Sequence, residues 1–497
     1  MWRGLPPLTA ATAGALQNEL RSAENDDTDD AWGVRIPRFG TARVGPWARR
    51  KAGFGRRCIH GIGTLSSPMR SAKVLTLPPH VEGRDVGGGG PQLASPVPAP
   101  SAMPVAEMGR DLRLDFFRGL ALFCIFLDHL PGNFLAQFTL QSVMFGDAAG
   151  VFILISGYTA GMVYGRGMER QGLLIAAVRI GHRVWQLYVA HVFLFMIFMA
   201  TVAYTVGAMN NALYAEEFLA ADFLNEPGVA VIKALTLQFQ PAYMDILPLY
   251  IVLLALFPLM LAGFRSWSKV MLGLSFALWV AVQLDSRIAL PAYPGPNRVW
   301  FFNPLGWQAL FFLGTWLGWR GIRDQRSWLD RGQSWLDQGW VLGLAAAVAL
   351  AGFVVRFSWT LHALYNPIPA LGNTKFLWLF MSKGDLGPLP FANVLALAVL
   401  VRRLISPRAS FLTGRVAWPF MTCGRHSLHI FCLGILLSVV GHLVLSEFFG
   451  GPLMQLAVSA AGVTIMIAVA ALMDWFAARA GAGARVPVHA STAGGKS

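Results

Sequence analysis

The feature that most constrains this chain is a series of apolar runs of about twenty residues, which recur between residues 112 and 473. A helix needs about 20 apolar residues to cross the hydrocarbon of a bilayer. Only 13% of the residues are charged and 55% are hydrophobic, whereas a soluble protein carries about 25% charged residues. In lipid, a backbone must satisfy its own hydrogen bonds. The pattern therefore predicts an all-α, polytopic membrane protein.

We expect about ten transmembrane helices within a membrane domain at residues 109–475. The predicted spans cover residues 112–130, 143–164, 184–206, 244–264, 270–284, a short stretch ending near 319, 341–359, 389–400, 427–445 and 453–473. Basic residues crowd the N-terminal tail and the loops after the second, fourth, sixth and eighth spans, whereas the other loops are neutral, acidic or mixed. By the positive-inside rule, both termini are expected in the cytoplasm, including a C-terminal tail at 476–497.

Residues 1–108 differ in composition from the membrane domain. They are rich in Gly, Pro, Ala and Ser, and they contain four consecutive glycines at 87–90. Such a segment buries too little apolar surface to fold, which predicts a disordered, low-complexity cytoplasmic tail. A start of translation at Met103 or Met108 is the alternative, and it would leave this tail out of the protein.

Charge and cysteine content argue against several function classes. The formal net charge is +14, but no nucleic-acid-binding motif accompanies it, and basic loops facing anionic lipid explain the excess. The four cysteines form no CxxC pair, so zinc and redox chemistry are not indicated. Cys124, Cys423 and Cys432 fall in or beside apolar spans and are expected to pack there. His426 and His429 share a helix face without a second ligand pair, so no metal site is predicted.

The first span carries charges that a lipid-facing helix would not keep. Asp115, Arg118, Asp128 and His129 lie within it, although one charge in hydrocarbon costs roughly 2.5–3.5 kcal/mol or more. Arg118 and His129 are eleven residues apart, so an α-helix places them on one face about 16 Å apart. Charges retained inside a span indicate function. We therefore expect a functional face with a cation near one end and an imidazole near the other.

His129 is suited to act as a general base for a hydroxyl group if a carboxylate orients its ring. Asp128 is adjacent in sequence, and neighbouring helical residues point about 100° apart, which makes it a poor direct partner. Asp147 and Asp245 are alternatives, since both are predicted near the same outer surface. A His–Asp pair that only ties helices together is the structural alternative to catalysis.

Two further features on the inner side have alternative interpretations. The Arg118 guanidinium suits a bidentate contact with phosphate or carboxylate, but it also lies near enough to the helix start to reach the inner headgroups. Arg179 and Arg183 are four residues apart and share a helix face. That pair suits either an anionic cofactor or lipid phosphates.

Four segments carry a resemblance to a known family. Arg118 and His129 resemble the R-x10-H signature of the membrane acyltransferase-3 superfamily. Looser resemblances to other motifs of that superfamily lie at VFILISGYTAG (151–161), RIGHRVWQLYVAH (179–191) and CGRHSLHIFCLG (423–434). Within the superfamily, DFFRGLALFCIFLDHLPGN is most similar to the OpgC branch, the succinyltransferases of osmoregulated periplasmic glucans. The resemblance covers residues 110–473.

The resemblance implies a bacterial inner-membrane O-acyltransferase with no tightly bound cofactor. Acyl-CoA, with succinyl as the expected acyl group, would be the donor from the cytoplasm, and a hydroxyl of a periplasmic glucan or other glycan would be the acceptor. His129, Arg118 and Asp128 form the expected catalytic set. The donor would contact Arg118, Arg179 and Arg183.

Two positions depart from the superfamily pattern. MDILPLY offers only Asp245 where a Glu is frequent, and His429 stands where an aromatic residue is common. The alternative function is a multi-pass carrier for an anion or a sugar, which would use the same intramembrane charges for binding. A scaffold with purely structural charges is the third interpretation.

Overall fold

Helices make up the regular structure of the part of the chain that can be described. The computed structural model describes residues 111–295, 298–325, 327–329, 335–364, 369–448 and 450–483. In those ranges there is no strand, only two isolated bridges. The all-α prediction is therefore confirmed. The predicted N-terminal tail (1–108) and residues 484–497 of the predicted C-terminal tail lie outside the described residues.

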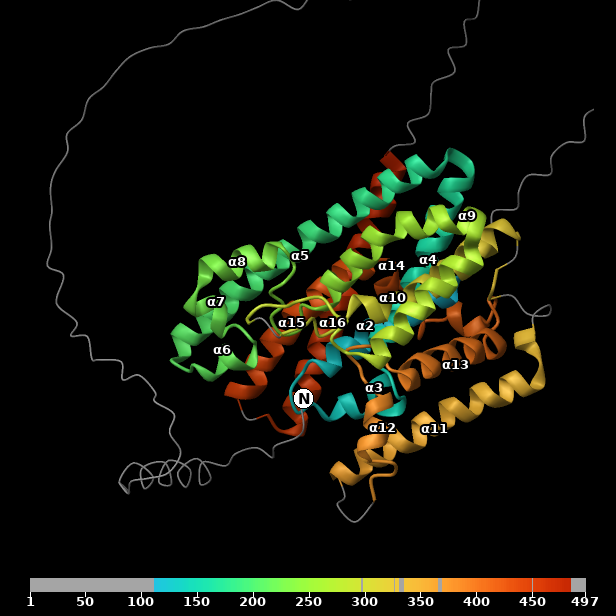
Figure 1. The fold of residues 1–497 in the computed structure, drawn as a ribbon. Helices are drawn as coiled ribbons and strands as arrows, with labels where there is room; N and C mark the ends of the chain where they lie inside the picture. Colours follow the sequence, from blue (N-terminus) through green and yellow to red (C-terminus); the bar gives the residue numbers. More distant parts are fainter. Residues whose placement is uncertain are drawn as a thin grey trace, which may run out of the picture. The chain divides into compact units, whose positions relative to one another are not determined.

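Nine long helices form the body of the described region (Figure 1). They are α2 (Leu112–Asp128), α4 (Ala148–Gln171), α5 (Leu173–Met209), α9 (Ile246–Leu284), α10 (Pro304–Arg323), α11 (Gly339–Leu364), α13 (Pro388–Leu404), α15 (Ser427–Glu447) and α16 (Pro452–Gly483). The shorter elements are η1 (Phe134–Phe138), α3 (Leu140–Val143), α6 (Leu213–Glu217), α7 (Ala221–Asn225), α8 (Pro227–Leu235), η2 (Trp335–Asp337), α12 (Lys375–Phe380), η3 (Ser410–Thr413) and α14 (Trp418–Arg425). In Figure 1, α6, α7 and α8 gather at one end of α5, and α13 lies beside α11.

Six of these helices are long and apolar enough to cross a membrane, which supports a multi-pass membrane protein. They are α4, α5, α9, α11, α15 and α16. The first, sixth and eighth predicted spans correspond to α2, α10 and α13, which are outside this group. The count of ten spans and the orientation of the termini stay predictions.

Two predicted loops are reduced to sharp turns. The fourth and fifth predicted spans correspond to the two arms of α9, which are two helices joined across a kink at Trp267, where φ is −135° and ψ is 42°. The bend is tight, because a Cβ atom on Gly263 would lie 2.4 Å from the side chain of Met271 on the other arm. The basic segment after the second span is helical, and α4 and α5 meet within it at Gly172, where φ is +88°. Arg179 and Arg183 therefore lie on α5.

Glycines bring α4 and α10 into direct backbone contact. Small residues of α4 let a neighbouring helix approach closely, and that neighbour is α10. A Cβ atom on Gly161 would lie 2.0 Å from the carbonyl oxygen of Thr315, and one on Gly157 would lie 2.3 Å from that of Phe311. From the other side, a Cβ on Gly318 would lie 2.1 Å from the Tyr158 carbonyl oxygen. Only glycine fits at these crossings.

The beginning of α2 is anchored in the same close-packed way. A Cβ atom on Gly119 would lie 1.9 Å from the carbonyl oxygen of Phe420 in α14. Asp111 caps α2 by accepting from the Arg113 backbone N–H, and the buried Arg113 guanidinium donates to Asp111 and to the carbonyls of Leu329 and Ile405. These contacts fix the position and rotation of the helix that carries Arg118 and His129.

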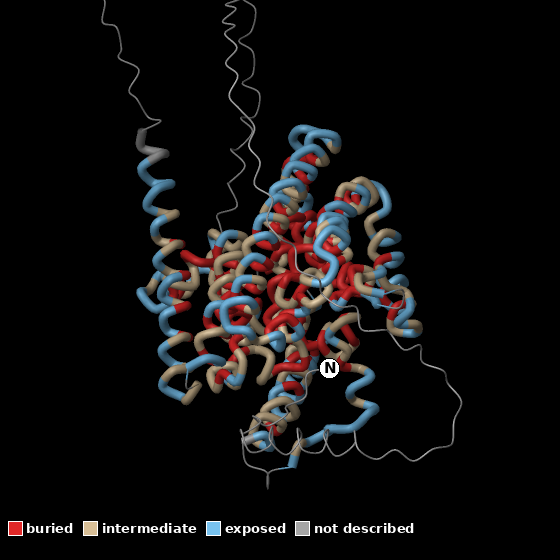
Figure 2. The backbone as a smooth tube through the Cα atoms, turned by 90° about the vertical axis from the view of Figure 1, so that its left-hand side faces the viewer, coloured by how far each residue is buried: buried red, intermediate tan, exposed pale blue. Residues whose placement is uncertain are grey.

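Burial follows the pattern of a bundle in lipid. Figure 2 shows the buried residues gathered along the inside of the bundle, with exposed residues on its outward faces. Many of the exposed side chains are apolar, for example Leu174, Phe193 and Tyr204 on α5, as expected where lipid replaces water. Cys124 and Cys423 are buried and Cys432 is partly buried, which confirms that these cysteines pack in the bundle.

Candidate active site

His129 stands at the point where α2 ends. It is the C-cap residue of the helix, and the chain then turns through Gly132 with φ of +62°. Pro131 and Gly132 thus follow directly after the end of the helix, as is typical of helix stop signals. The imidazole packs against the ring of Tyr243, with ring centroids 4.6 Å apart and planes tilted by 50°. We call this region the His129 end of α2.

Asp128 does not bind the imidazole. Its Oδ1 accepts a hydrogen bond from the Thr139 hydroxyl at 2.5 Å, which ties α2 to the segment between η1 and α3. The buried Nδ1 of His129 has no hydrogen-bond partner among the described residues. In this structure, then, none of the carboxylates of Asp128, Asp147 and Asp245 holds that ring nitrogen.

The other two carboxylates have different local roles. Asp147 caps α4, because its Oδ1 accepts from the backbone N–H groups of Ala149 and Gly150. Its Oδ2 lies 2.6 Å from the ammonium of Lys383. Asp245 occupies the N-cap position of α9 without a side-chain cap hydrogen bond.

Lys383 was not singled out by the sequence patterns, because it is an isolated Lys in the loop before α13. Burial lowers the pKa of its ammonium, but three neighbouring carboxylates outweigh this effect and hold the pKa above its usual value. These carboxylates belong to Asp147, Asp245 and Asp128. Lys383 also lies within electrostatic reach of His129. The His129 end therefore combines an imidazole, three acidic groups and one fixed cation.

At the other end of α2, Arg118 turns toward α4. Its Nη2 donates to the Thr159 hydroxyl at 2.9 Å, and its Nη1 lies 3.9 Å from Asp115. The side chain is 13% exposed, so it does not extend outward along the helix surface. We call this region the Arg118 end of α2.

Arg183 and Arg118 both act electrostatically on one tyrosine. Both guanidinium groups lie within electrostatic reach of the Tyr250 hydroxyl on α9, and Arg183 also acts on His429 of α15. Arg179 is exposed and lies beside Gly167 of α4. The structure thus brings Arg118 and Arg183 to the same tyrosine from α2 and α5, whereas Arg179 lies one turn away.

His426 and His429, the two histidines that follow α14, do not bind the same group. His426 Nε2 lies 2.8 Å from Asp474 of α16, and Arg425 donates to the other oxygen of the same carboxylate at 2.6 Å. His429 takes no part in this contact. Across the described ranges, no three His, Cys, Asp or Glu side chains converge as metal ligands do.

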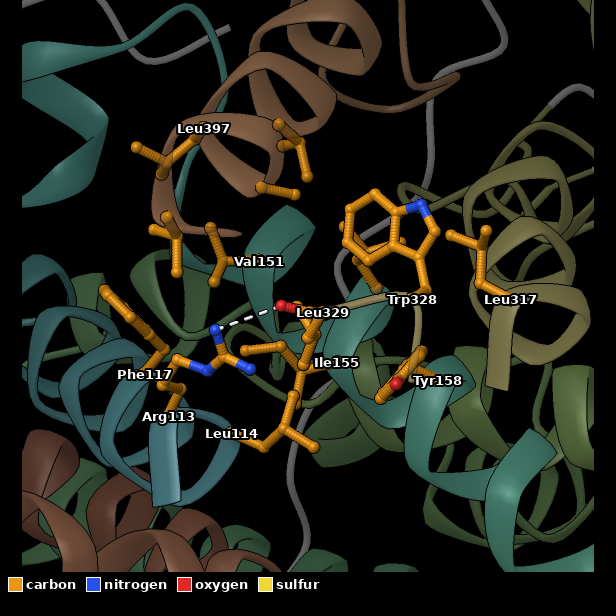
Figure 3. A pocket seen from close by; sticks show the side chains of 14 residues that line it. Arg113, Leu114, Phe117, Val151, Ile155, Tyr158, Leu317, Trp328, Leu329 and Leu397 are labelled. Atoms are coloured by element: carbon orange, nitrogen blue, oxygen red, sulfur yellow. Dashed lines mark hydrogen bonds between the residues drawn. The ribbon is translucent and has the colours of Figure 1, made fainter. Parts of the chain in front are cut away.

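An apolar cavity of about 70 Å³ lies near the start of α2. Figure 3 shows Leu114 and Phe117 on one side, Val151 and Ile155 of α4 beside them, and Trp328 opposite. The only charged lining residue is Arg113, whose guanidinium already donates to backbone carbonyls. The lining formed by the described residues is mainly apolar, so this cavity suits a hydrocarbon group.

Comparisons with known proteins agree with the resemblance at the level of the family. A family model described as "OpgC protein" matches residues 110–478. Comparisons with curated proteins and with solved structures found no match. The matched range includes both ends of α2 and every helix described above except the last residues of α16 (479–483). Since it covers more than half of the chain, the protein belongs to the OpgC protein family.

Proposed function

We propose that this protein is an O-acyltransferase of the bacterial inner membrane within the acyltransferase-3 superfamily. It transfers an acyl group, succinyl in our proposal, from a cytoplasmic acyl-CoA to a hydroxyl of a periplasmic glucan. The observation that carries the proposal is that α2 holds two polar clusters on one helix face, about 16 Å apart by helix geometry. A reaction with its donor on one side of a membrane and its acceptor on the other needs such a separation.

In this mechanism His129 acts as the general base. Its imidazole takes the proton of the sugar hydroxyl as that oxygen bonds to the carbonyl carbon of the thioester. The C–S bond then breaks, and the imidazolium returns the proton to the departing CoA thiolate. The ammonium of Lys383, within electrostatic reach of His129, stabilises the negative charge that develops on the carbonyl oxygen. Asp128 contributes by holding the segment after α2 through Thr139.

Arg118 and Arg183 bind the donor in this proposal. Guanidinium groups suit phosphate and carboxylate oxygens because their donors form a planar fork. Both act electrostatically on the buried hydroxyl of Tyr250, Arg118 from α2 and Arg183 from α5, and Nη1 of Arg183 also donates to Gln186 on the exposed side of α5. Arg179, one turn earlier on α5, is available to a more peripheral phosphate.

Removing the Arg118 guanidinium is expected to weaken donor binding. Arg118→Ala should raise the KM for acyl-CoA by roughly ten- to a hundredfold, because a hydrogen bond to a charged group contributes about 1.5–3 kcal/mol. Arg118→Lys should recover part of this loss, since it restores the charge without the fork. The measurement is the initial rate of ester formation in membranes as acyl-CoA is varied.

Arg287→Ala is the matched control, since Arg287 is an exposed arginine paired only with its neighbour Asp285. Its KM should equal that of the wild type. An equal KM for Arg118→Ala and Arg287→Ala would contradict the assignment of Arg118 to the donor.

The proposed function itself is tested on the glucan fraction of cells with and without the protein. Mass spectrometry should find ester-linked acyl groups, identified by their mass, only when the protein is present. A carrier for an anion or a sugar predicts instead that labelled solute crosses vesicle membranes while the glucan stays unmodified. That second result would overturn the proposed function.

A further inference from the structure

Tyr243 has an unusual backbone conformation beside the proposed catalytic histidine. Its φ is +68°, in the left-handed region that bulky residues seldom occupy. Such conformations cost about 1–3 kcal/mol and persist where the surrounding structure imposes them, often at functional sites. Here the conformation accompanies a ring that lies against His129, with centroids 4.6 Å apart.

The Tyr243 hydroxyl faces a second buried histidine. It lies 3.4 Å from Nδ1 of His442, a residue of α15 that is 1% exposed. The Nε2 of His442 in turn lies 2.9 Å from the carboxylate of Glu217, the last residue of α6, in a close charge contact outside hydrogen-bond geometry. Phe218 packs its ring on His442 at 4.8 Å. Glu217, His442 and Tyr243 thus form a connected row that ends at His129, and we call it the Glu217 row.

The chemistry of the Glu217 row indicates which of its atoms carry protons and which accept them. A carboxylate beside Nε2 favours the histidine tautomer that carries its proton on that nitrogen. Nδ1 is then an acceptor, and the Tyr243 hydroxyl donates to it. This hydrogen bond sets the orientation of the Tyr243 ring, which covers one face of the His129 imidazole. Because His129 Nδ1 has no partner among the described residues, the aromatic contact takes the place of an orienting carboxylate.

We propose that Glu217, His442 and Tyr243 are positioning residues for His129 and hold its imidazole in the orientation that receives the acceptor proton. This inference rests on the proposed function, because it assumes that His129 acts as the base. None of the three side chains needs to touch the reacting atoms. Their effect is on the geometry of His129, and a misplaced base lowers the rate of the chemical step.

The test measures initial rates of ester formation on glucan in membranes, at matched amounts of full-length protein. Tyr243→Ala should lower kcat by roughly tenfold or more, because the imidazole loses its packing partner. Tyr243→Phe and Glu217→Gln should each lower kcat by about threefold to tenfold with the KM for acyl-CoA unchanged. The double variant should be no slower than the slower single variant, since both changes break the same row.

Two further variants separate positioning from simple structural support. His442→Asn places an amide oxygen near the position of Nδ1 and should recover much of the rate that His442→Ala loses. Glu447→Gln is the matched control, because Glu447 of α15 accepts from Tyr214 of α6 and so links the same two helices as Glu217 and His442 do. It makes no contact with the Glu217 row in the described residues, and its kcat should stay within about twofold of the wild type.

Several results would overturn the inference. Wild-type rates for Tyr243→Phe and Glu217→Gln, with His129→Ala inactive, would show that the row does not position the base. An equal loss of kcat in Glu447→Gln and Glu217→Gln would show that the Glu217 row only connects α6 to α15 and does not position His129. Full activity of His129→Ala would instead contradict the proposed role of His129 as the base, on which this inference rests.

Discussion

Replacing His129 with alanine is expected to lower the rate of acyl transfer to glucan by about a hundredfold to ten-thousandfold, the contribution of a positioned general base. His129→Gln should be as inactive, because the amide fills similar space but cannot accept and return a proton. The effect should fall on kcat, since the donor is held at the Arg118 end of α2. The measurement is ester content per glucan over time, at protein levels matched by immunoblot.

The control for this prediction is another histidine of the bundle. His191 of α5 is fully buried, and neither ring nitrogen has a partner among the described residues. His191→Ala therefore removes an imidazole of equal size at a position outside both polar ends of α2. It should retain most of the activity per folded protein. A His129→Ala protein that works as well as His191→Ala would exclude His129 as the base.

Gly161→Ala is expected to lower the stability of the protein strongly. Its Cβ atom would lie 2.0 Å from the carbonyl oxygen of Thr315, a backbone atom that cannot rotate away. Overpacking of this kind costs about 1–3 kcal/mol and occasionally more. Moving α4 away from α10 would also open the neighbouring contact at Gly157. We expect a lower yield of folded protein in detergent and a lower midpoint of thermal unfolding.

Gly207→Ala provides the comparison, since a Cβ atom at Gly207 of α5 would meet nothing within 4 Å. In a helix interior alanine is favoured over glycine by roughly 0.5–1 kcal/mol. Gly207→Ala should therefore unfold at the same temperature as the wild type or slightly higher. Identical unfolding midpoints for the two variants would contradict the close crossing of α4 and α10.

The relative positions of the proposed site residues could be predicted only where one helix carries them. Arg118 and His129 share a helix, so their spacing follows from the helix repeat alone. The partners of His129 belong to other elements, and no periodicity relates them to α2. Tyr243 precedes α9, Lys383 precedes α13 and His442 lies within α15. Adjacency suggested Asp128 as a partner, but its side chain binds Thr139.

Helix boundaries illustrate the same limit. Charged residues at 265–269 and 166–183 suggested loops, because charges usually mark the ends of spans. The structure reduces the first segment to a kink at Trp267, where the two helices of α9 join, and the second to a turn at Gly172 between α4 and α5. Charged residues indicate which parts of the chain face water. Where a helix ends depends instead on backbone hydrogen bonding and on residues such as Gly and Pro.

By itself the sequence determined the all-α membrane class, the polar face of α2 and the family. These properties depend on composition, on local spacing and on motifs within single helices. Only the tertiary structure decided that α10 packs on the glycines of α4, that Arg118 and Arg183 both lie within electrostatic reach of Tyr250, and that Tyr243 packs on His129. Such contacts join residues far apart in the chain, and they depend on how helices cross, which local sequence does not encode.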